Sequence, residues 1–282
     1  MQARQPYFYR YGGGRFIGPP AGPAKDRQLQ FFWSRTRRIA QAEDAHGVLW
    51  VEQQGRKRYL VFGEDSEQSL VNMRKPLRLE YEYSRAMLLG GLCHEQPETA
   101  LFLGLGSGVL LRACLAAMPG IIDAEIIELR PEVLRLARDY MGFIEDERMT
   151  IRIGDALELL PSAERADLIF LDLYDEQGPS RAHMAWDFLE RCHALLEPDG
   201  WLVINQWALP DSKPLATPLL RGLFHNHYWE LPVSEGNVIL LVPAATTQNL
   251  PVQALRERAR AVGKRLGFPL EPLLANIRLP AP

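Results

Sequence analysis

Two acidic residues three positions apart, Asp172 and Asp175, stand on a loop that closes with Gly178 and Pro179. The loop follows an apolar run over 167–172 that predicts a buried strand. A carboxylate beside an ammonium can hold it and remove its proton as the amine attacks, since an amine is a poor nucleophile while protonated. The pair therefore predicts a general base that works on a cationic substrate; a solvated acidic loop is the alternative.

Three glycines, Gly104, Gly106 and Gly108, lie in a second segment that could bind a ligand. Apolar residues 99–103 predict a buried strand before them, and residues 109–118 predict a helix after them. Glycine lets the backbone turn sharply against a ligand, and the first amides of the helix face that ligand. Tight turns use glycine everywhere, so the triplet alone is weak support for a site.

Acidic residues at the ends of the next two strands strengthen this interpretation. Glu128 stands twenty positions after Gly108, at the end of an expected strand over 122–127, where a carboxylate can accept both hydroxyls of a ribose. Asp155 and Ala156 follow a third expected strand. Asp155 is equally typical of a helix N-cap. A capping aspartate can also lie near the edge of an adenine, so the two roles are compatible. Together these residues predict a nucleoside site.

The elements that position these residues alternate along the chain. The expected strands cover 99–104, 122–127, 149–153, 167–172 and 201–206, and the expected helices cover 108–118, 131–141, 156–160 and 184–196. Such alternation predicts an α/β fold, in which a parallel sheet has helices on both faces and binds ligands at the carboxyl ends of its strands. With a closing antiparallel hairpin over 228–242, it resembles the seven-stranded, Rossmann-like sheet of S-adenosylmethionine-dependent methyltransferases.

We expect four segments in the chain. They are a basic, Gly/Pro-rich extension over 1–45, a small antiparallel β unit over 46–78, the Rossmann-like domain over 79–245, and a helix with a tail over 246–282. Residues 1–40 carry eight Lys/Arg against a single acid, Asp26. An arm that contacts RNA is possible on charge grounds, but its glycines and prolines favour a loose extension packed on its own acidic body or on a partner subunit.

Composition narrows the classes of protein to which the chain could belong. The chain has 282 residues, of which 47% are hydrophobic, and a net charge of −3, so no general electrostatic attraction to nucleic acid or to an anionic membrane is expected. It has no secretory signal and no membrane span, which predicts a cytoplasmic protein. The spacing of the three cysteines indicates reduced core residues. His225 and His227 fall on an expected strand, and the six histidines together form no ligand set, so no metal is expected.

Five motifs between residues 47 and 242 match one family pattern. They are Gln68-Ser69, Tyr83, Glu128, Gly154-Asp155-Ala156 and the Asp-x-x-Asp-x-x-Gly-Pro loop that starts at Asp172. In these motifs the chain resembles the spermidine synthase, or aminopropyltransferase, family of polyamine biosynthesis. The resemblance implies a cytoplasmic homodimer that moves an aminopropyl group from decarboxylated S-adenosylmethionine to a small-molecule amine.

The resemblance also implies a role for each matching residue. Asp172 would act as the general base, with Asp175 and Tyr83 positioning the amine. The nucleoside donor would be bound by the residues of the small unit, the glycine loop and the strand ends, namely Gln68, Gly104, Gly106, Ser107, Gly108, Glu128, Asp155 and Ala156.

The chain departs from the family pattern where ammonium groups are held. Ser107 stands where the family has an acid for the aminopropyl ammonium, and Leu105 occupies a glycine position. In the segment before the glycine loop, over 79–85, one family acid is replaced by Leu79 and another by Arg85. Both ammonium-binding regions are thus altered, while the nucleoside and base residues are kept.

Three interpretations follow. Aminopropyl transfer explains Asp172 and Asp175 best. A methyltransferase using S-adenosylmethionine explains Ser107, because loop amides and a hydroxyl accept the donor carboxylate that an acid would repel. A nucleoside-binding homologue without turnover is the third. Binding of S-adenosylmethionine, its decarboxylated form and methylthioadenosine would separate them.

Overall fold

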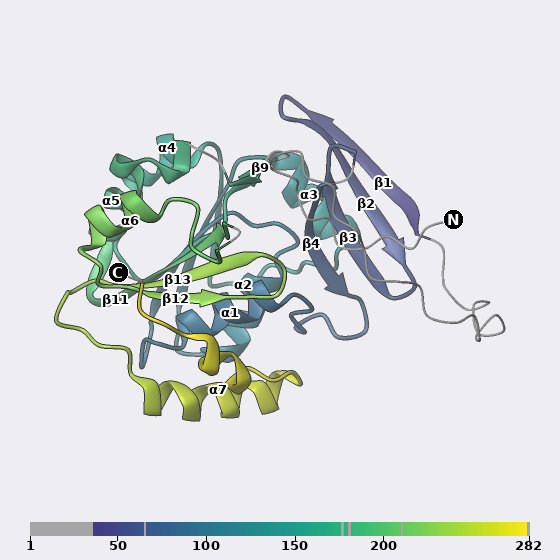
Figure 1. The fold of residues 1–282 in the computed structure, drawn as a ribbon. Coiled ribbons are helices and arrows are strands. Elements are labelled where there is room, and N and C mark those ends of the chain that lie inside the picture. Colours follow the sequence, from purple (N-terminus) through teal and green to yellow (C-terminus); the bar gives the residue numbers. More distant parts are fainter. Residues whose placement is uncertain (1–35, 65, 176–177, 180–181, 210, 281–282) are drawn as a thin grey trace, which may run out of the picture.

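The computed structural model describes residues 36–64, 66–175, 178–179, 182–209 and 211–280. Residues 1–35, which include six of the eight basic residues counted over 1–40, lie outside the described part of the chain. Two sheets make up the fold, a smaller antiparallel one near the start of the described chain and a larger mixed one (Figure 1).

The smaller sheet is a four-stranded antiparallel meander. Its strands follow the chain in the order β1 (Arg37–Asp44), β2 (Gly47–Gln54), β3 (Lys57–Phe62) and β4 (Ser66–Asn72). The sheet therefore begins at Arg37, within the segment expected to be an extension. Strand β1 lacks an apolar alternation, and only Ala42 of it is buried, so its sequence gave no strand signal.

The larger sheet has seven strands in the order β12-β13-β11-β8-β5-β6-β7. The five parallel strands are β5 (Thr99–Leu103), β6 (Asp123–Glu128), β7 (Met149–Ile153), β8 (Ala166–Leu171) and β11 (Leu196–Trp207). Strands β12 (Trp229–Pro232) and β13 (Asn237–Pro243) form the antiparallel hairpin at one edge. The predicted fold class is confirmed, because this is a mostly parallel seven-stranded sheet with an antiparallel end.

Helices cover both faces of the larger sheet (Figure 1). One face packs against α1 (Glu82–Gly91), α2 (Val109–Ala117), α3 (Pro131–Tyr140) and α7 (Val252–Leu266). The other packs against α4 (Ala156–Leu159), α5 (Trp186–Ala194) and α6 (Thr217–Phe224). The strands divide accordingly, since Phe102 and Phe170 stack at 4.6 Å on the first face while Leu101 and Leu103 face the second.

Helix α6 was not expected from the sequence, and it changes the position of two histidines. The helix ends at Phe224, and its C-cap residue His225 has a left-handed φ of 51°, so His225 and His227 lie in the turn before β12 and not on a strand. Helix α3 packs against β1 and β2 and joins the smaller sheet to the larger one.

All three cysteines are buried and none forms a disulfide. Among the described helices, none combines the length and the apolar character needed to cross a membrane.

Candidate active site

The glycine loop turns from β5 into α2 at the carboxyl edge of the larger sheet. Gly104, Gly106 and Gly108 all have positive φ, at 99°, 56° and 72°. A Cβ at Gly104 would stand 2.5 Å from the carbonyl oxygen of Asp172, and one at Gly108 would stand 2.3 Å from the ring of Phe143. Glycine is therefore required at both positions, because the backbone of the candidate catalytic loop and an aromatic ring lie against the turn.

Glu128, the predicted ribose acid, lies beneath this loop and is 7% exposed. Its carboxylate accepts the backbone N–H of Leu105 at 2.9 Å and that of Arg130 at 2.9 Å. Burial raises the pKa of Glu128, and the backbone donors oppose the rise. The backbone of Gly106 also lowers the pKa as a third donor, and since a carboxylate has about four lone-pair sites, capacity is left for a ribose hydroxyl.

Arg130 connects this acid to the smaller sheet. Its guanidinium donates to Asp44 at 2.9 and 2.8 Å and to the carbonyl of Gly47 at 2.7 Å, and it lies 4.8 Å above the ring of Phe62. Burial, the largest single influence, raises the pKa of Asp44, but the hydrogen bonds from Arg130 and from the backbone of His46, together with their charges, hold that pKa below its ordinary value. The β1–β2 turn thus fixes the backbone that donates to Glu128.

Strand β4 supplies a second contact to the glycine loop. Ser69 Oγ lies 2.6 Å from Ser107 Oγ and accepts the backbone N–H of Ser107 at 3.0 Å, and both serines are buried. The Gln68 side-chain amide donates to Ser66 Oγ at 2.8 Å, while the backbone carbonyl of Gln68 accepts the hydroxyl of Tyr83 at 3.2 Å. The structure therefore places the predicted residues of β4 beside both the loop and the aromatic residue of α1.

Asp155 occupies the N-cap of α4, as its alternative interpretation predicted. Its carboxylate accepts the N–H of Leu157 at 2.8 Å and lies 3.3 Å from Nε2 of His183. Ala156 follows and is buried. The contact of His183 was not foreseen; this residue belongs to the short 3-10 turn after the candidate catalytic loop, and no local pattern links it to Asp155.

Asp172, the predicted base, stands just beyond β8 at the same edge. Asn205 of β11 donates to its Oδ1 at 2.8 Å, Asn237 of β13 donates to Asn205 Oδ1 at 2.9 Å, and Asn237 also donates to the hydroxyl of Tyr174 at 3.3 Å. Burial raises the pKa of Asp172 to about 6, although the bond from Asn205 works in the opposite direction. This carboxylate is ionised at neutral pH yet basic enough to take a proton.

Asn205 and Asn237 were missed at the level of sequence. A signal existed for Asn205, which interrupts the apolar run 201–204 of a central strand. A polar side chain in such a strand must be hydrogen-bonded, so it is a candidate partner for the nearest acid.

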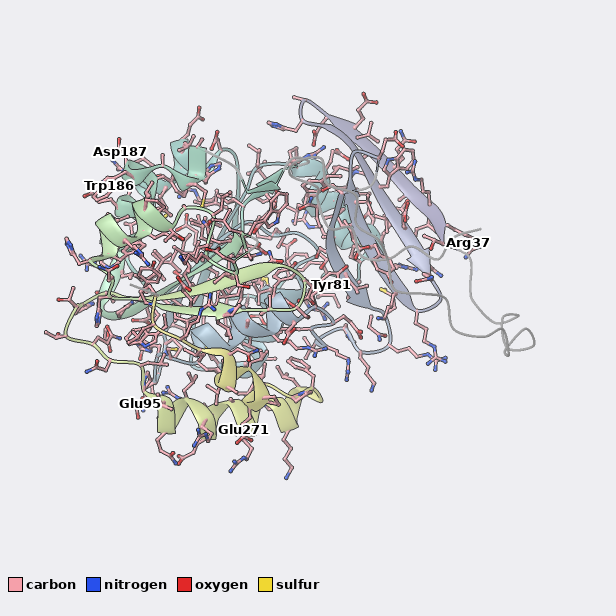
Figure 2. The ribbon with its side chains drawn as sticks, viewed as in Figure 1. Arg37, Tyr81, Glu95, Trp186, Asp187 and Glu271 are labelled. Atoms are coloured by element: carbon pink, nitrogen blue, oxygen red, sulfur yellow. The ribbon has the colours of Figure 1, made fainter. Side chains whose placement is uncertain are left out.

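Aromatic side chains surround this acid. Burial and the negative charge of Asp172 raise the pKa values of Tyr83 and Tyr174 well above the ordinary value, so both phenols keep their protons at neutral pH. Tyr83 stacks on Tyr81 at 5.6 Å between centroids, and Tyr174 lies 6.1 Å from Trp207. Tyr81 lies on the side of the larger sheet that faces the smaller one (Figure 2). Aromatic faces beside a carboxylate suit a cationic or amine ligand.

Only the backbone of Asp175 is described. It pairs with Gly178 in a short ribbon of β9 (Tyr174–Asp175) and β10 (Gly178–Pro179). The role predicted for its side chain falls outside the described part of the structure.

Comparison with known proteins agrees with this arrangement. The family model of the spermine/spermidine synthase domain matches residues 80–212, from the segment before α1 to beyond β11. The polyamine aminopropyltransferase of Neisseria meningitidis is 26% identical over 251 residues, which cover 87% of this chain and 95% of that protein. The chain is therefore similar to the spermidine synthases, at low sequence identity.

Two solved structures share the fold of this chain. A spermidine synthase in complex with the transition-state analogue AdoDATO has a TM-score of 0.70 at 18% identity and covers 91% of this chain and 94% of its own. Human methyltransferase-like protein 13 in complex with SAH has a TM-score of 0.57 at 25% identity and covers 67% of this chain and 93% of its own. The first likeness extends over the smaller sheet as well as the larger one.

Proposed function

We propose that this protein transfers an aminopropyl group from decarboxylated S-adenosylmethionine to an amine, with Asp172 as the general base. The observation that carries the proposal is the partly buried, ionised Asp172, oriented by Asn205 beside Tyr83 and Tyr174 at the carboxyl edge of the sheet. The relationship to polyamine aminopropyltransferases over most of the chain supports it.

In the proposed step the neutral amine nitrogen attacks the aminopropyl carbon bonded to the sulfonium. A carbon–nitrogen bond forms, the carbon–sulfur bond breaks with its electron pair going to sulfur, and neutral methylthioadenosine leaves. The proton lost by the amine passes to the carboxylate of Asp172. A base with a pKa of about 6 accepts this proton without being largely protonated beforehand at neutral pH.

The donor would lie along the edge formed by the glycine loop, Glu128 and the start of α4. The loop amides and Ser107 would face its sulfonium tail, Glu128 its ribose, and Asp155 with Ala156 its adenine, while Gln68 borders the tail from β4. Tyr83 and Asp175 would position the amine, and the proposed enzyme would act as a homodimer.

Methyl transfer from S-adenosylmethionine is the second candidate, and Ser107 favours it. The pair formed by the Ser69 and Ser107 hydroxyls at 2.6 Å is neutral, so it lacks the charge with which an acid would hold an aminopropyl ammonium and repel a donor carboxylate. The likeness to the human methyltransferase structure at 25% identity agrees with this alternative.

Product identity under single-turnover conditions tests the two candidates. The protein is mixed in excess with each donor and a panel of mono- and diamines, and the nucleoside product is identified by chromatography. Methylthioadenosine that depends on the amine supports aminopropyl transfer. S-adenosylhomocysteine alone contradicts it and supports methyl transfer. Calorimetric binding of methylthioadenosine without turnover of either donor would instead indicate a nucleoside-binding protein.

A further inference from the structure

Three residues far apart in the sequence meet at the edge of the larger sheet opposite the candidate active site. His94 follows α1, Asp167 stands near the start of β8, and Asp199 lies in the first part of β11. Because Asp167 and Asp172 are five residues apart on one extended strand, this edge is roughly 16 Å from the candidate base. Glu95, the neighbour of His94, lies on the side of α7 (Figure 2).

The potential ligand atoms of these residues converge. Nε2 of His94 is 3.4 Å from Oδ2 of Asp199 and 3.8 Å from Oδ1 of Asp167, and the ligand atoms of the three lie within 4.8 Å of one another. Asp167 is held rigidly, since its Oδ2 accepts the N–H of Glu98 at 2.7 Å and both the N–H and the hydroxyl of Thr99, at 2.9 and 3.1 Å. Its other oxygen faces His94.

A separate observation concerns His94 itself. The residue is 8% exposed, and neither of its ring nitrogens has a hydrogen-bond partner. Buried polar atoms in native proteins are nearly always satisfied, and an exception indicates a missing partner such as a water or an ion. The missing partner belongs on the Nε2 side, because both carboxylates stand there.

We propose that His94, Asp167 and Asp199 bind one divalent transition-metal ion of the zinc class. Imidazole nitrogen with carboxylate oxygen is a ligand set for such ions, whereas calcium and magnesium take oxygen ligands. Metal–ligand bonds of about 2.0–2.2 Å in tetrahedral geometry require ligand atoms about 3.3–3.6 Å apart. The pair of His94 and Asp199 already meets this spacing, and the Asp199 side chain, 77% exposed, can move to meet Asp167.

The ion would link the segment after α1 to strands β8 and β11 at the amino edge of the sheet, and water would complete its coordination. This site is separate from the proposed chemistry. No metal was expected from the histidine spacing, because the ligands come from positions 94, 167 and 199 and only the fold brings them together. The competing account is a protonated His94 that is ion-paired to the two carboxylates without a metal.

Metal titration of the chelator-treated full-length protein tests the proposal. Isothermal titration with zinc chloride at pH 7.5 should show one equivalent bound, the melting temperature should rise with zinc concentration, and cobalt(II) should give a tetrahedral absorption spectrum without a thiolate charge-transfer band. Asp199→Asn should weaken zinc binding at least about tenfold. The control Asp123→Asn, an exposed acid at the start of β6 on the same edge, should bind as the unaltered protein does.

Three results would overturn the proposal. They are no binding of zinc or cobalt, unchanged affinity in Asp199→Asn, and a thiolate band that assigns the bound ion to cysteine. Because His94 is buried, His94→Gln is measured only as a second variant, after circular dichroism shows that it folds. None of these measurements depends on turnover, so failure of the metal site and failure of the proposed aminopropyl transfer are distinguishable.

Discussion

Replacing Asp172 by asparagine should make the protein less active and more stable at the same time. Asparagine keeps the shape of the side chain and can still accept the N–H of Asn205, now 2.8 Å from Oδ1, but it cannot take a proton. Removing a general base lowers turnover by about 10² to 10⁴. Donor affinity should change little, because this carboxylate is assigned to the amine.

The gain in stability follows from the same pKa. Burial raises the pKa of Asp172 from 3.8 to about 6, and this difference corresponds to roughly 3 kcal/mol. The folded protein holds the proton more tightly than the unfolded chain does, so stability is lost as the pH rises from 3.8 to about 6, and the loss is complete above that. Asp172→Asn escapes this loss and should raise the free energy of unfolding at pH 7.5 by up to about 3 kcal/mol.

Two measurements check this prediction. Single-turnover rates between pH 5 and 9 should fall on the acid side with an apparent pKa near 6 in the unaltered protein. Urea unfolding at pH 5 and pH 7.5 should show a stability gap between the two proteins that is larger at pH 7.5. Asp187→Asn, an exposed acid at the start of α5, is the matched control (Figure 2). Turnover at the unaltered rate in Asp172→Asn refutes the base, and a pH-independent gap refutes the reasoning from burial.

Three further predictions concern Asn205, the proposed ribose acid Glu128 and strand β1. Asn205→Ala removes the donor that opposes the rise in the pKa of Asp172, so the acid limb of the rate profile should move to higher pH; an unmoved limb contradicts the assigned contact. Glu128→Ala should weaken calorimetric binding of methylthioadenosine by about 1.5 to 3 kcal/mol, and unchanged affinity in a folded variant would remove the ribose assignment. A chain that starts at Arg37 should melt as the full chain does, whereas one that starts at Ala45 lacks β1 and should melt lower or aggregate; equal melting of the two would show that β1 adds no stability.

The alternation of strands and helices in the larger sheet could be predicted because most of its parallel strands contain an apolar run and are followed by a helical segment. The smaller sheet was predicted only in part. Strand β1 consists mostly of charged and polar residues around a single buried alanine, and its place in the sheet comes from pairing with β2 and from the contact between Asp44 and Arg130. Such long-range contacts leave no local periodicity.

The edge on which the candidate site lies could also be predicted, since ligands in parallel sheets bind at the carboxyl ends of the strands. Which atoms meet there could not. The sequence places Glu128 near the glycine loop, but only the fold shows that its oxygens accept backbone N–H groups from Leu105 and Arg130. Asn237 lies on the antiparallel hairpin, and its bond to Asn205 depends on the register between β11 and β13.

The serine pair at the glycine loop does not by itself select between the two donors. Ser69 and Ser107 are buried and bonded to each other, and Ser69 also accepts the N–H of Ser107, so the contact between these two serines is a neutral surface. A neutral surface loses the attraction that an acid offers to an aminopropyl ammonium, yet it repels neither donor. Selection between the two donors must then come from the amine side, where Asp172 and the surrounding tyrosines stand. Such a protein would bind both donors, and it would react with the donor whose amine acceptor needs a base.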